Sequence, residues 1–320
     1  MVKKVKKTET GWDDYNPKTD NILVIGDLHY TSTRTSAIHE AEQSILSICK
    51  GKTFSKIILL GDLFDKKPTT EERILLATLL KTLRNYSAQL HFILGNGIHT
   101  FDTGSGAIYE GDWMLLCSDF FQHTQLELGD FIFAHAEFKG TKYINGFDSK
   151  STLEINPDKT YLSGHIHEPA LSFNNINYVG SIYKTDFSEI YDKKRIAIIE
   201  NGKIIWFPIN SRPMHQIKLV GKGGGVKVDK ETKEFLQNTP EKSEMDLKIV
   251  VDTDSQSLGA IDRQIAKIKA KFSIEYYVQT KTIMEVKTDI PKNLDKTELL
   301  KTFCKTKNIS IDLVLKEMVE

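Results

Sequence analysis

The sequence is poor in cysteine and contains no long apolar run. Its three cysteines, Cys49, Cys117 and Cys304, are far apart and odd in number, which argues against a disulfide framework and predicts a reducing compartment. No apolar stretch approaches the ~20 residues that a membrane-spanning helix needs, and the first residues lack the apolar segment of a signal peptide. We therefore expect a soluble, cytoplasmic protein with no membrane partner.

The sequence also lacks a net charge, because 43 basic residues balance 43 acidic ones. A freestanding nucleic-acid binder usually has a basic surface, so this balance counts mildly against strong intrinsic affinity for DNA. With 320 residues the chain is longer than one average domain, and a large domain with a smaller one is the expected organisation.

What the sequence does contain is a series of potential metal ligands, each of which follows an apolar run. The runs 21–26, 56–61, 89–94, 130–134 and 160–163 are typical of buried strands. Side chains at the ends of such strands gather at one edge of a sheet, where ligands bind in open α/β folds. The seven candidates are Asp27, His29, Asp62, Asn96, His135, His165 and His167.

The chemical mixture of these side chains indicates the kind of metal. Carboxylate, carboxamide and imidazole together suit Mn²⁺, Fe²⁺ or Zn²⁺, and the set contains no cysteine that would favour a structural zinc site. Seven ligands are too many for one tetrahedral ion but enough for two ions that share a carboxylate. Two ions ~3.5–4 Å apart can clamp the attacking and leaving oxygens of a phosphoryl displacement. We therefore predict phosphoester hydrolysis with two divalent ions, Mn²⁺ first and Mg²⁺, Fe²⁺ or Zn²⁺ as alternatives.

The order Asp-x-His, Gly-Asp-x-x-Asp, Gly-Asn, His, Gly-His-x-His resembles that of the calcineurin-like metallophosphoesterases. The resemblance implies an α/β fold with a four-layer β-sandwich flanked by helices. It also implies that Asp62 bridges the two ions and that Asp65 orients a neighbouring side chain by a hydrogen bond. The implied ligands are Asp27, His29, Asp62 and His167 for one ion, and Asp62, Asn96, His135 and His165 for the other.

A further stretch narrows this resemblance. Residues 178–189 are similar to the Tyr-x-Gly-Ser…Phe-x-Glu segment of the SbcD-type nuclease subunit of double-strand-break repair complexes, and the similarity covers about residues 20–220. It implies DNA as the substrate, an SMC-like, SbcC-type ATPase as a partner, and a homodimer. The compact size favours a viral or otherwise streamlined homologue.

The chain departs from the family at one position. It reads Gly95-Asn96-Gly97-Ile98-His99, whereas the family usually has a histidine directly after the asparagine, which acts at the phosphate. His99 could replace that catalytic imidazole, because a glycine frees the backbone of the loop, or it could be an ordinary loop histidine. The protein could therefore be a slow enzyme, an altered one, or a metal-loaded scaffold.

Four regions follow from these patterns: an N-terminal tail at 1–20, the nuclease domain at 21–212, a cap at 213–287 and a helical C-terminal segment at 288–320. The cap is expected to be a β-α-β unit with strands at 248–252 and 276–286 and a helix at 258–272. By analogy it orients DNA, and Lys267, Lys269 and Lys271 could contact phosphate or form a solvated helix face. The C-terminal segment either binds the ATPase partner or packs on the cap.

The function that these observations favour is a two-metal DNA nuclease, the nuclease subunit of an SbcD-like recombination and repair complex. Two alternatives stay open. One is a metal-dependent phosphodiesterase or phosphatase that acts on a small molecule. The other is a catalytically silent metal-binding scaffold, which Gly97 favours.

Overall fold

The computed structural model describes residues 15–87, 89–96, 120–141, 143, 147–168, 172–173 and 175–282. Gly97, His99 and the segment 288–320 lie outside these residues, so the predictions made for them are not addressed by the structure. None of the helices in the described ranges is long and apolar enough to cross a membrane.

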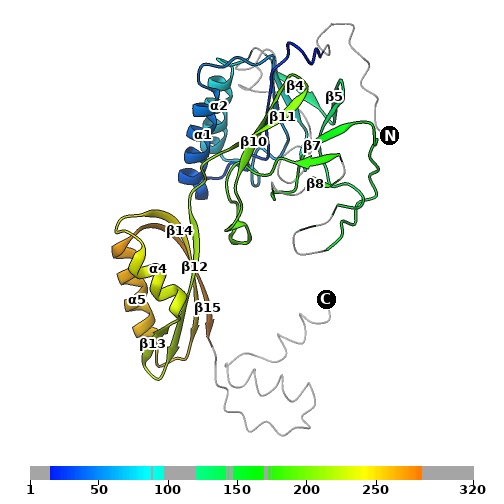
Figure 1. The fold of residues 1–320 in the computed structure, drawn as a ribbon. Helices are drawn as coiled ribbons and strands as arrows, with labels where there is room; N and C mark the ends of the chain where they lie inside the picture. Colours follow the sequence, from blue (N-terminus) through cyan, green and yellow to red (C-terminus); the bar gives the residue numbers. More distant parts are fainter. Residues whose placement is uncertain are drawn as a thin grey trace, which may run out of the picture.

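The first part of the chain is built on a six-stranded mixed sheet in the order β11-β10-β1-β2-β3-β4 (Figure 1). Strands β1 to β4 are parallel, while β10 and β11 are antiparallel additions. All residues of β1, β2 and β3 are buried, as expected for parallel strands covered on both faces. The strands are β1 (Ile22–Ile25), β2 (Lys56–Leu59), β3 (Leu90–Ile93), β4 (Phe120–His123), β10 (Arg195–Glu200) and β11 (Lys203–Pro208).

Two helices, α1 (Thr35–Cys49) and α2 (Thr70–Leu83), cover one face of this sheet. Helix α2 begins with a capping box in which the Thr69 hydroxyl accepts from the Glu72 amide and the Glu72 carboxylate accepts from the Thr69 amide. Its leucines pack with Leu23 and Ile25 of β1 into a continuous apolar cluster. The neighbouring residues of β1 face the other way, because successive side chains of a strand alternate.

A second, five-stranded sheet in the order β5-β6-β7-β9-β8 packs against that other face. Ile22 and Val24 of β1 share an apolar cluster there with Phe133 of β6 and Leu162 of β7. The predicted α/β class, a β-sandwich with flanking helices, is therefore confirmed. The strands of this sheet are β5 (Leu126–Leu128), β6 (Phe131–His135), β7 (Thr160–Gly164), β8 (Ser172–Phe173) and β9 (Ile176–Tyr178).

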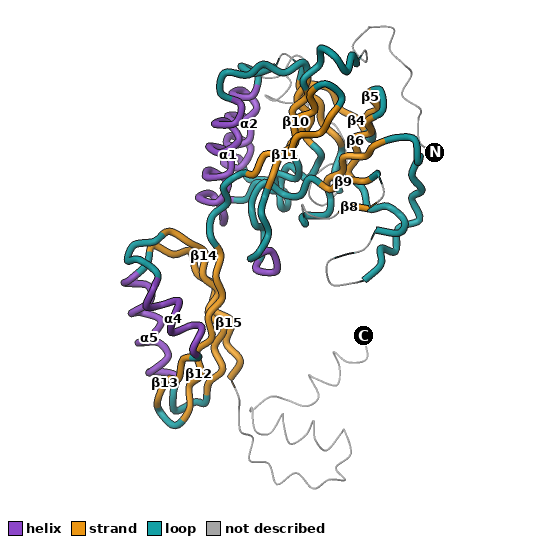
Figure 2. The backbone as a smooth tube through the Cα atoms, in the orientation of Figure 1, coloured by secondary structure: helices purple, strands orange, loops and turns teal. Residues whose placement is uncertain are grey.

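The second part of the chain is a four-stranded sheet in the order β13-β12-β14-β15, with α4 (Lys230–Asn238) and α5 (Leu258–Lys271) along one face (Figure 2). The sequence predicted only a β-α-β unit here, and the structure adds a hairpin and a helix. Gly223 and Gly224 have φ values of 60° and 80°, so they form the tight turn of that hairpin. The strands are β12 (Met214–Lys222), β13 (Gly225–Val228), β14 (Glu244–Thr253) and β15 (Ser273–Thr282).

The two parts meet through buried charges. Asp246 on β14 is fully buried and accepts from Arg212 Nε at 2.9 Å. It also accepts from Arg34 at the end of the 3-10 helix η1 (Ser32–Arg34) in the first part. A carboxylate held between two guanidinium groups fixes the small sheet against the loops that follow β1.

Candidate metal centre

The seven predicted ligands lie at the carboxyl ends of parallel strands. Asp27 and His29 follow β1, Asp62 follows β2 and Asn96 follows β3, and these three strands are neighbours in one sheet. In the other sheet His135 ends β6, and His165 and His167 follow its parallel neighbour β7. The sandwich brings these two edges together, so all seven side chains form one connected cluster.

The backbone at the cluster is conformationally unusual. His29, Asp62 and His165 have φ values of 44°, 38° and 78°, a region that residues other than glycine rarely occupy. Such conformations cost free energy and are typical of functional sites, where the surrounding structure holds them in place. Three of the predicted ligands are therefore held in a conformation that local sequence preference does not favour.

The glycines of the two Gly-containing motifs make room for the ligands. A Cβ atom at Gly164 would collide with Asp27 and His135, and one at Gly61 would collide with the His135 ring. Gly61 also has a φ of 107°, which favours glycine. The structural role of these glycines is to let two strand ends approach the same imidazole.

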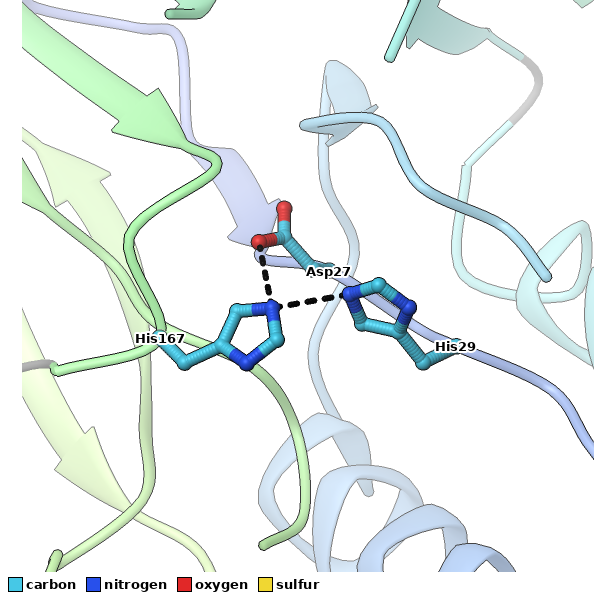
Figure 3. A group of neighbouring side chains, drawn as sticks. All are labelled: Asp27, His29 and His167. Carbon is cyan, nitrogen blue, oxygen red and sulfur yellow. Dashed lines mark hydrogen bonds and ion pairs between the residues drawn. The ribbon is translucent and has the colours of Figure 1, made fainter. Parts of the chain in front are cut away.

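One group of ligands consists of Asp27, His29 and His167 (Figure 3). The Nε2 atoms of the two histidines are 2.8 Å apart, and His167 Nε2 lies 3.7 Å from Asp27 Oδ2. Asp62 Oδ2 is 3.8 Å from His29 Nε2. Asp27, His29 and His167 are three of the four residues that the resemblance implied for the first ion, and their ligand atoms lie within 4.8 Å of one another; Asp62, the fourth, contacts His29 and groups with Asp27 and His135.

The second group centres on His135. Its Nε2 atom lies 3.2 Å from Asp62 Oδ2, and its Nδ1 atom lies 3.4 Å from Asp27 Oδ1. The side chains of Asn96 and His165 are hydrogen-bonded at 2.9 Å. The backbone N–H of Asn96 donates to Asp62 Oδ1 at 2.8 Å. Asp62 therefore contacts residues of both implied ligand sets, as a bridging carboxylate must.

Buried polar atoms at the centre fit a divalent cation. Asp27 Oδ1 and His135 Nε2 are buried and have ion-pair contacts of 3.4 Å and 3.2 Å, but neither makes a well-directed hydrogen bond to a described residue, so each can take a further partner. The donor set of carboxylates, imidazoles and one carboxamide suits Mn²⁺, Fe²⁺ or Zn²⁺. The residues present thus fit the two ions that the sequence predicted.

The electrostatics of the centre also favour a bound cation. Burial alone would raise the pKa of Asp27, but His135, His167 and His29 outweigh it and hold that pKa at about 2. Burial would lower the pKa of His135, yet Asp27 and Asp62 raise it to about 10. The carboxylates thus stabilise positive charge at the centre strongly, and a bound metal ion supplies such charge in place of a proton.

Residues outside the predicted set hold His167 in place. His167 Nδ1 lies 3.0 Å from Glu189 Oε1 and 3.1 Å from Thr185 Oγ1. Lys194, itself buried, donates to Glu189 Oε2 at 2.6 Å and to Ser181 Oγ at 2.9 Å. With Nδ1–H donating to Glu189, the Nε2 lone pair is directed at the centre, as metal-binding histidines require. Glu189 is the last residue of the Phe-x-Glu segment that the sequence singled out, but the sequence gave neither Glu189 nor Lys194 a role at the site.

The remaining predicted residues are less closely tied to the centre. Asp65 Oδ1 is 4.0 Å from His29 Nδ1, and its side chain is 49% exposed. This contact with His29 is longer than a hydrogen bond. Lys267 and Lys269 are exposed on α5, which covers the face of the small sheet opposite to Asp246, and Lys271 donates to the Leu236 carbonyl.

Comparison with known families agrees with this geometry. Residues 21–169 match the family described as calcineurin-like phosphoesterase, and this range contains all seven predicted ligands. The chain thus contains a calcineurin-like phosphoesterase domain, which implies metal-dependent hydrolysis of phosphoesters. A comparison with curated proteins gave no match, so the SbcD-type assignment stays a prediction.

Proposed function

We propose that this chain, whose residues 21–169 match the calcineurin-like phosphoesterase family, hydrolyses phosphodiester bonds of DNA as an SbcD-type nuclease subunit. The observation that carries the choice of DNA is a basic sheet face beside the metal centre. It belongs to the small four-stranded sheet and is the face that α4 and α5 leave uncovered.

Strand alternation defines this open face. In β14, Leu247, Ile249 and Val251 point into the apolar cluster under the helices, so Lys248 and Asp252 point to the opposite side. The register pairs Lys248 with Gln216 and Val220 with Lys227, and directly paired residues share a face. The lysines of the open face are Lys218, Lys222, Lys227 and Lys248.

The open face is continuous with the phosphoesterase domain. Lys248 Nζ lies 6.0 Å from the ring centroid of Phe187, which belongs to the loop that carries Glu189. Asp246, on the same strand and face as Lys248, is neutralised by Arg34 and Arg212. A phosphate backbone bound at the metal centre could therefore extend along a row of lysines, which supports a polymeric substrate over a small phosphoester.

The ions and the protein side chains would have different roles in hydrolysis. Divalent ions bound at the centre would polarise the phosphoryl group and make water a better nucleophile near neutral pH. The chain positions the ligands, because Glu189 orients His167 and the Leu60 carbonyl accepts from His135 Nδ1 at 2.6 Å. Tyr183 fixes the loop of His29 by donating to its carbonyl oxygen at 2.6 Å.

DNA binding by the open face can be separated from binding by α5. We expect the triple variant Lys218→Gln, Lys222→Gln, Lys227→Gln to bind a duplex more weakly and to lower the slope of log K against log salt by about one per lysine. The matched control is the triple variant Lys267→Gln, Lys269→Gln, Lys271→Gln. We expect it to change the duplex affinity and its salt dependence little. Loss of binding in the second variant alone would assign the contact to α5. An unchanged affinity in both, with hydrolysis of a small phosphodiester retained, would favour a small-molecule phosphodiesterase or phosphatase.

The metal and the partners belong to the same proposal. We propose Mn²⁺ as the working ion, a homodimer as the assembly, and an SMC-like, SbcC-type ATPase as the partner of residues 288–320. The partner proposal predicts co-purification with such an ATPase and its loss on truncation after Asp289. A complex that survives the truncation would contradict it.

A further inference from the structure

The loop that holds the metal ligand His167 also contacts the small sheet. This loop, residues 184–190, lies in the connection between β9 and β10 and contains the 3-10 helix η2 (Phe187–Glu189). It contacts the Nδ1 side of the His167 ring, while the Nε2 atom of that ring faces Asp27 and His29 (Figure 3). One segment is therefore placed between the metal centre and the second part of the chain.

On the side of the metal centre, Thr185 and Glu189 fix the ring of His167. Glu189 Oε1 and Thr185 Oγ1 lie 3.0 Å and 3.1 Å from His167 Nδ1. Thr185 donates twice to the Glu189 carboxylate, with its backbone N–H to Oε2 at 3.1 Å and with its hydroxyl to Oε1. Lys194 donates to Oε2, so Thr185 is the residue that holds the oxygen next to His167. The position of Thr185 therefore helps to set the direction of the imidazole.

On the side of the small sheet, Arg34 connects Thr185 to Asp246. The Arg34 side chain is buried, and it donates with one nitrogen to the Asp246 carboxylate and with another to the Thr185 carbonyl oxygen at 3.2 Å. A guanidinium group is planar and rigid, so it holds its two acceptors at a fixed separation. A displacement of Asp246 would therefore break the contact with Thr185 or move Thr185 with it.

A second contact joins the same loop to the same strand. Lys248, two residues after Asp246 on β14, has its Nζ atom 6.0 Å from the Phe187 ring centroid, and Arg34 Cζ is 5.9 Å from that centroid. Both cations are within the ~6 Å over which an aromatic ring attracts positive charge. The small sheet thus contacts the 184–190 loop at two of its residues.

Arg212 provides a natural comparison, because it binds the same carboxylate without binding the loop. Its Nε atom donates to Asp246 Oδ1 at 2.9 Å, and its guanidinium also pairs with Glu40 and Glu244. Both arginines therefore hold the small sheet in place. Of the two, only Arg34 donates to the 184–190 loop within the part of the chain that the structure describes.

We propose that Arg34 and Asp246 are positioning residues for the metal ligand His167, so that metal binding and docking of the small sheet stabilise each other. The docked sheet holds Thr185 through Arg34, Thr185 holds Glu189, and Glu189 directs His167 Nε2 to the centre. The coupling is reciprocal, because a docked sheet that raises the metal affinity must itself dock more tightly when metal is bound. This inference rests on the metal centre of the proposed function and does not require DNA as the substrate.

The test compares the Mn²⁺ affinity of the full-length variants Arg34→Gln and Arg212→Gln by isothermal titration. Each variant loses one charged partner of Asp246, so both should lower the urea midpoint. Only Arg34→Gln should bind Mn²⁺ more weakly, by about tenfold, since losing a group that orients metal ligands typically costs 10- to 100-fold in affinity. Arg212→Gln should keep the affinity of the native chain.

A milder pair of variants keeps the test decisive if Arg34→Gln does not fold. In Arg34→Lys the ammonium group can still pair with Asp246, but it lacks the planar fork that reaches Thr185 at the same time. It should therefore bind Mn²⁺ more weakly than Arg212→Lys does.

A double-mutant cycle tests the route through the loop. If Arg34 acts on His167 through Glu189, the losses of Mn²⁺ affinity in Arg34→Gln and Glu189→Gln should be less than additive when combined. Adding Arg212→Gln to Glu189→Gln should cause no further loss. Full additivity of the first pair would contradict the route.

The outcomes separate this inference from the proposed function. Native binding of Mn²⁺ with equal affinities in Arg34→Gln and Arg212→Gln overturns the positioning role and leaves the metal centre standing, whether both variants match the native chain or both are weakened. No binding of Mn²⁺ by the native chain overturns both.

Discussion

Arg212 and Asp246 form a buried ion pair across the boundary between the phosphoesterase domain and the small sheet. Arg212 Nε donates to Asp246 Oδ1 at 2.9 Å, and the residues are 5% and 0% exposed. Arg34 donates to the other oxygen of the same carboxylate and also to the Thr185 carbonyl at 3.2 Å. Because the Thr185 hydroxyl contacts His167, the junction and the metal centre share a hydrogen-bond network.

Removing the carboxylate should destabilise this junction. Asp246→Asn removes the buried carboxylate that Arg34 and Arg212 share, although Arg212 keeps Glu40 at 3.2 Å. Removing one partner of a buried ion pair costs about 3–5 kcal/mol. Urea unfolding should show the loss as a lower midpoint or as separate unfolding of the two parts. The control is Asp252→Asn on the same strand and the same face, which should change the free energy of unfolding by less than about 0.5 kcal/mol. Equal effects of the two substitutions would contradict the network.

Glu189 gives the metal-free chain a pH-dependent stability. Burial would raise the pKa of Glu189, but His167 and Lys194 lower it from 4.5 to about 2. A depressed carboxylate pKa stabilises the folded state above the unfolded value, and this contribution disappears as the pH falls through the folded value. The difference in free energy of unfolding between the wild type and Glu189→Gln should therefore shrink from pH 4.5 to 2. Measurements in a chelator would show a constant difference if the ion pair were unimportant.

Gly164 should be essential for metal binding. A methyl group there would collide with Asp27 and His135, and the ligands would have to separate. We expect Gly164→Ala to bind Mn²⁺ at least about tenfold more weakly, since changes beside metal ligands typically cost 10- to 100-fold in affinity. Gly225→Ala is the matched control, because a Cβ there meets only the Lys222 carbonyl at 3.8 Å. Isothermal titration gives both affinities, and equal values would contradict the close packing.

Metal ions should stabilise the fold and bind more tightly as the pH rises. Asp27 and Asp62 raise the pKa of His135 to about 10, so a metal ion must displace a proton from it at neutral pH. Each unit of pH should then strengthen binding about tenfold per proton released. Mn²⁺ at a hundred times its Kd should add about 2.7 kcal/mol of stability. Asp27→Asn should lose this gain and the exposed Asp158→Asn should keep it; a pH-independent Kd would contradict the proton displacement.

The strands and the ligands could be predicted from the sequence because both depend on local pattern. Apolar runs mark β1, β2 and β3, and parallel strands necessarily end at one edge, so Asp27, Asp62 and Asn96 could be placed together before the fold was known. The leucine spacing of α2 and the acidic residues after Thr69 are likewise local patterns that predict a helix and its start.

Other features depend on contacts that no local pattern shows. Glu189 and Lys194 act on His167 from 22 and 27 residues away, and only the folded loop makes them neighbours. The glycine-rich stretch 221–225 suits a flexible linker as well as the tight turn between β12 and β13, so local sequence does not predict this hairpin. The basic open face required the strand register, because Lys218 and Lys248 share a face only when β12 pairs with β14.

The central claim is tested most directly by Mn²⁺-dependent cleavage of an end-labelled DNA duplex by the native chain. Asp62→Ala, which removes the implied bridging carboxylate, serves as the blank, and Gly97→His restores the imidazole that the related family has. We expect cleavage by the native chain and more by Gly97→His, with none from Asp62→Ala or in a chelator. No cleavage by either the native chain or Gly97→His, with Mn²⁺ bound at the centre, would contradict the assignment of DNA as the substrate.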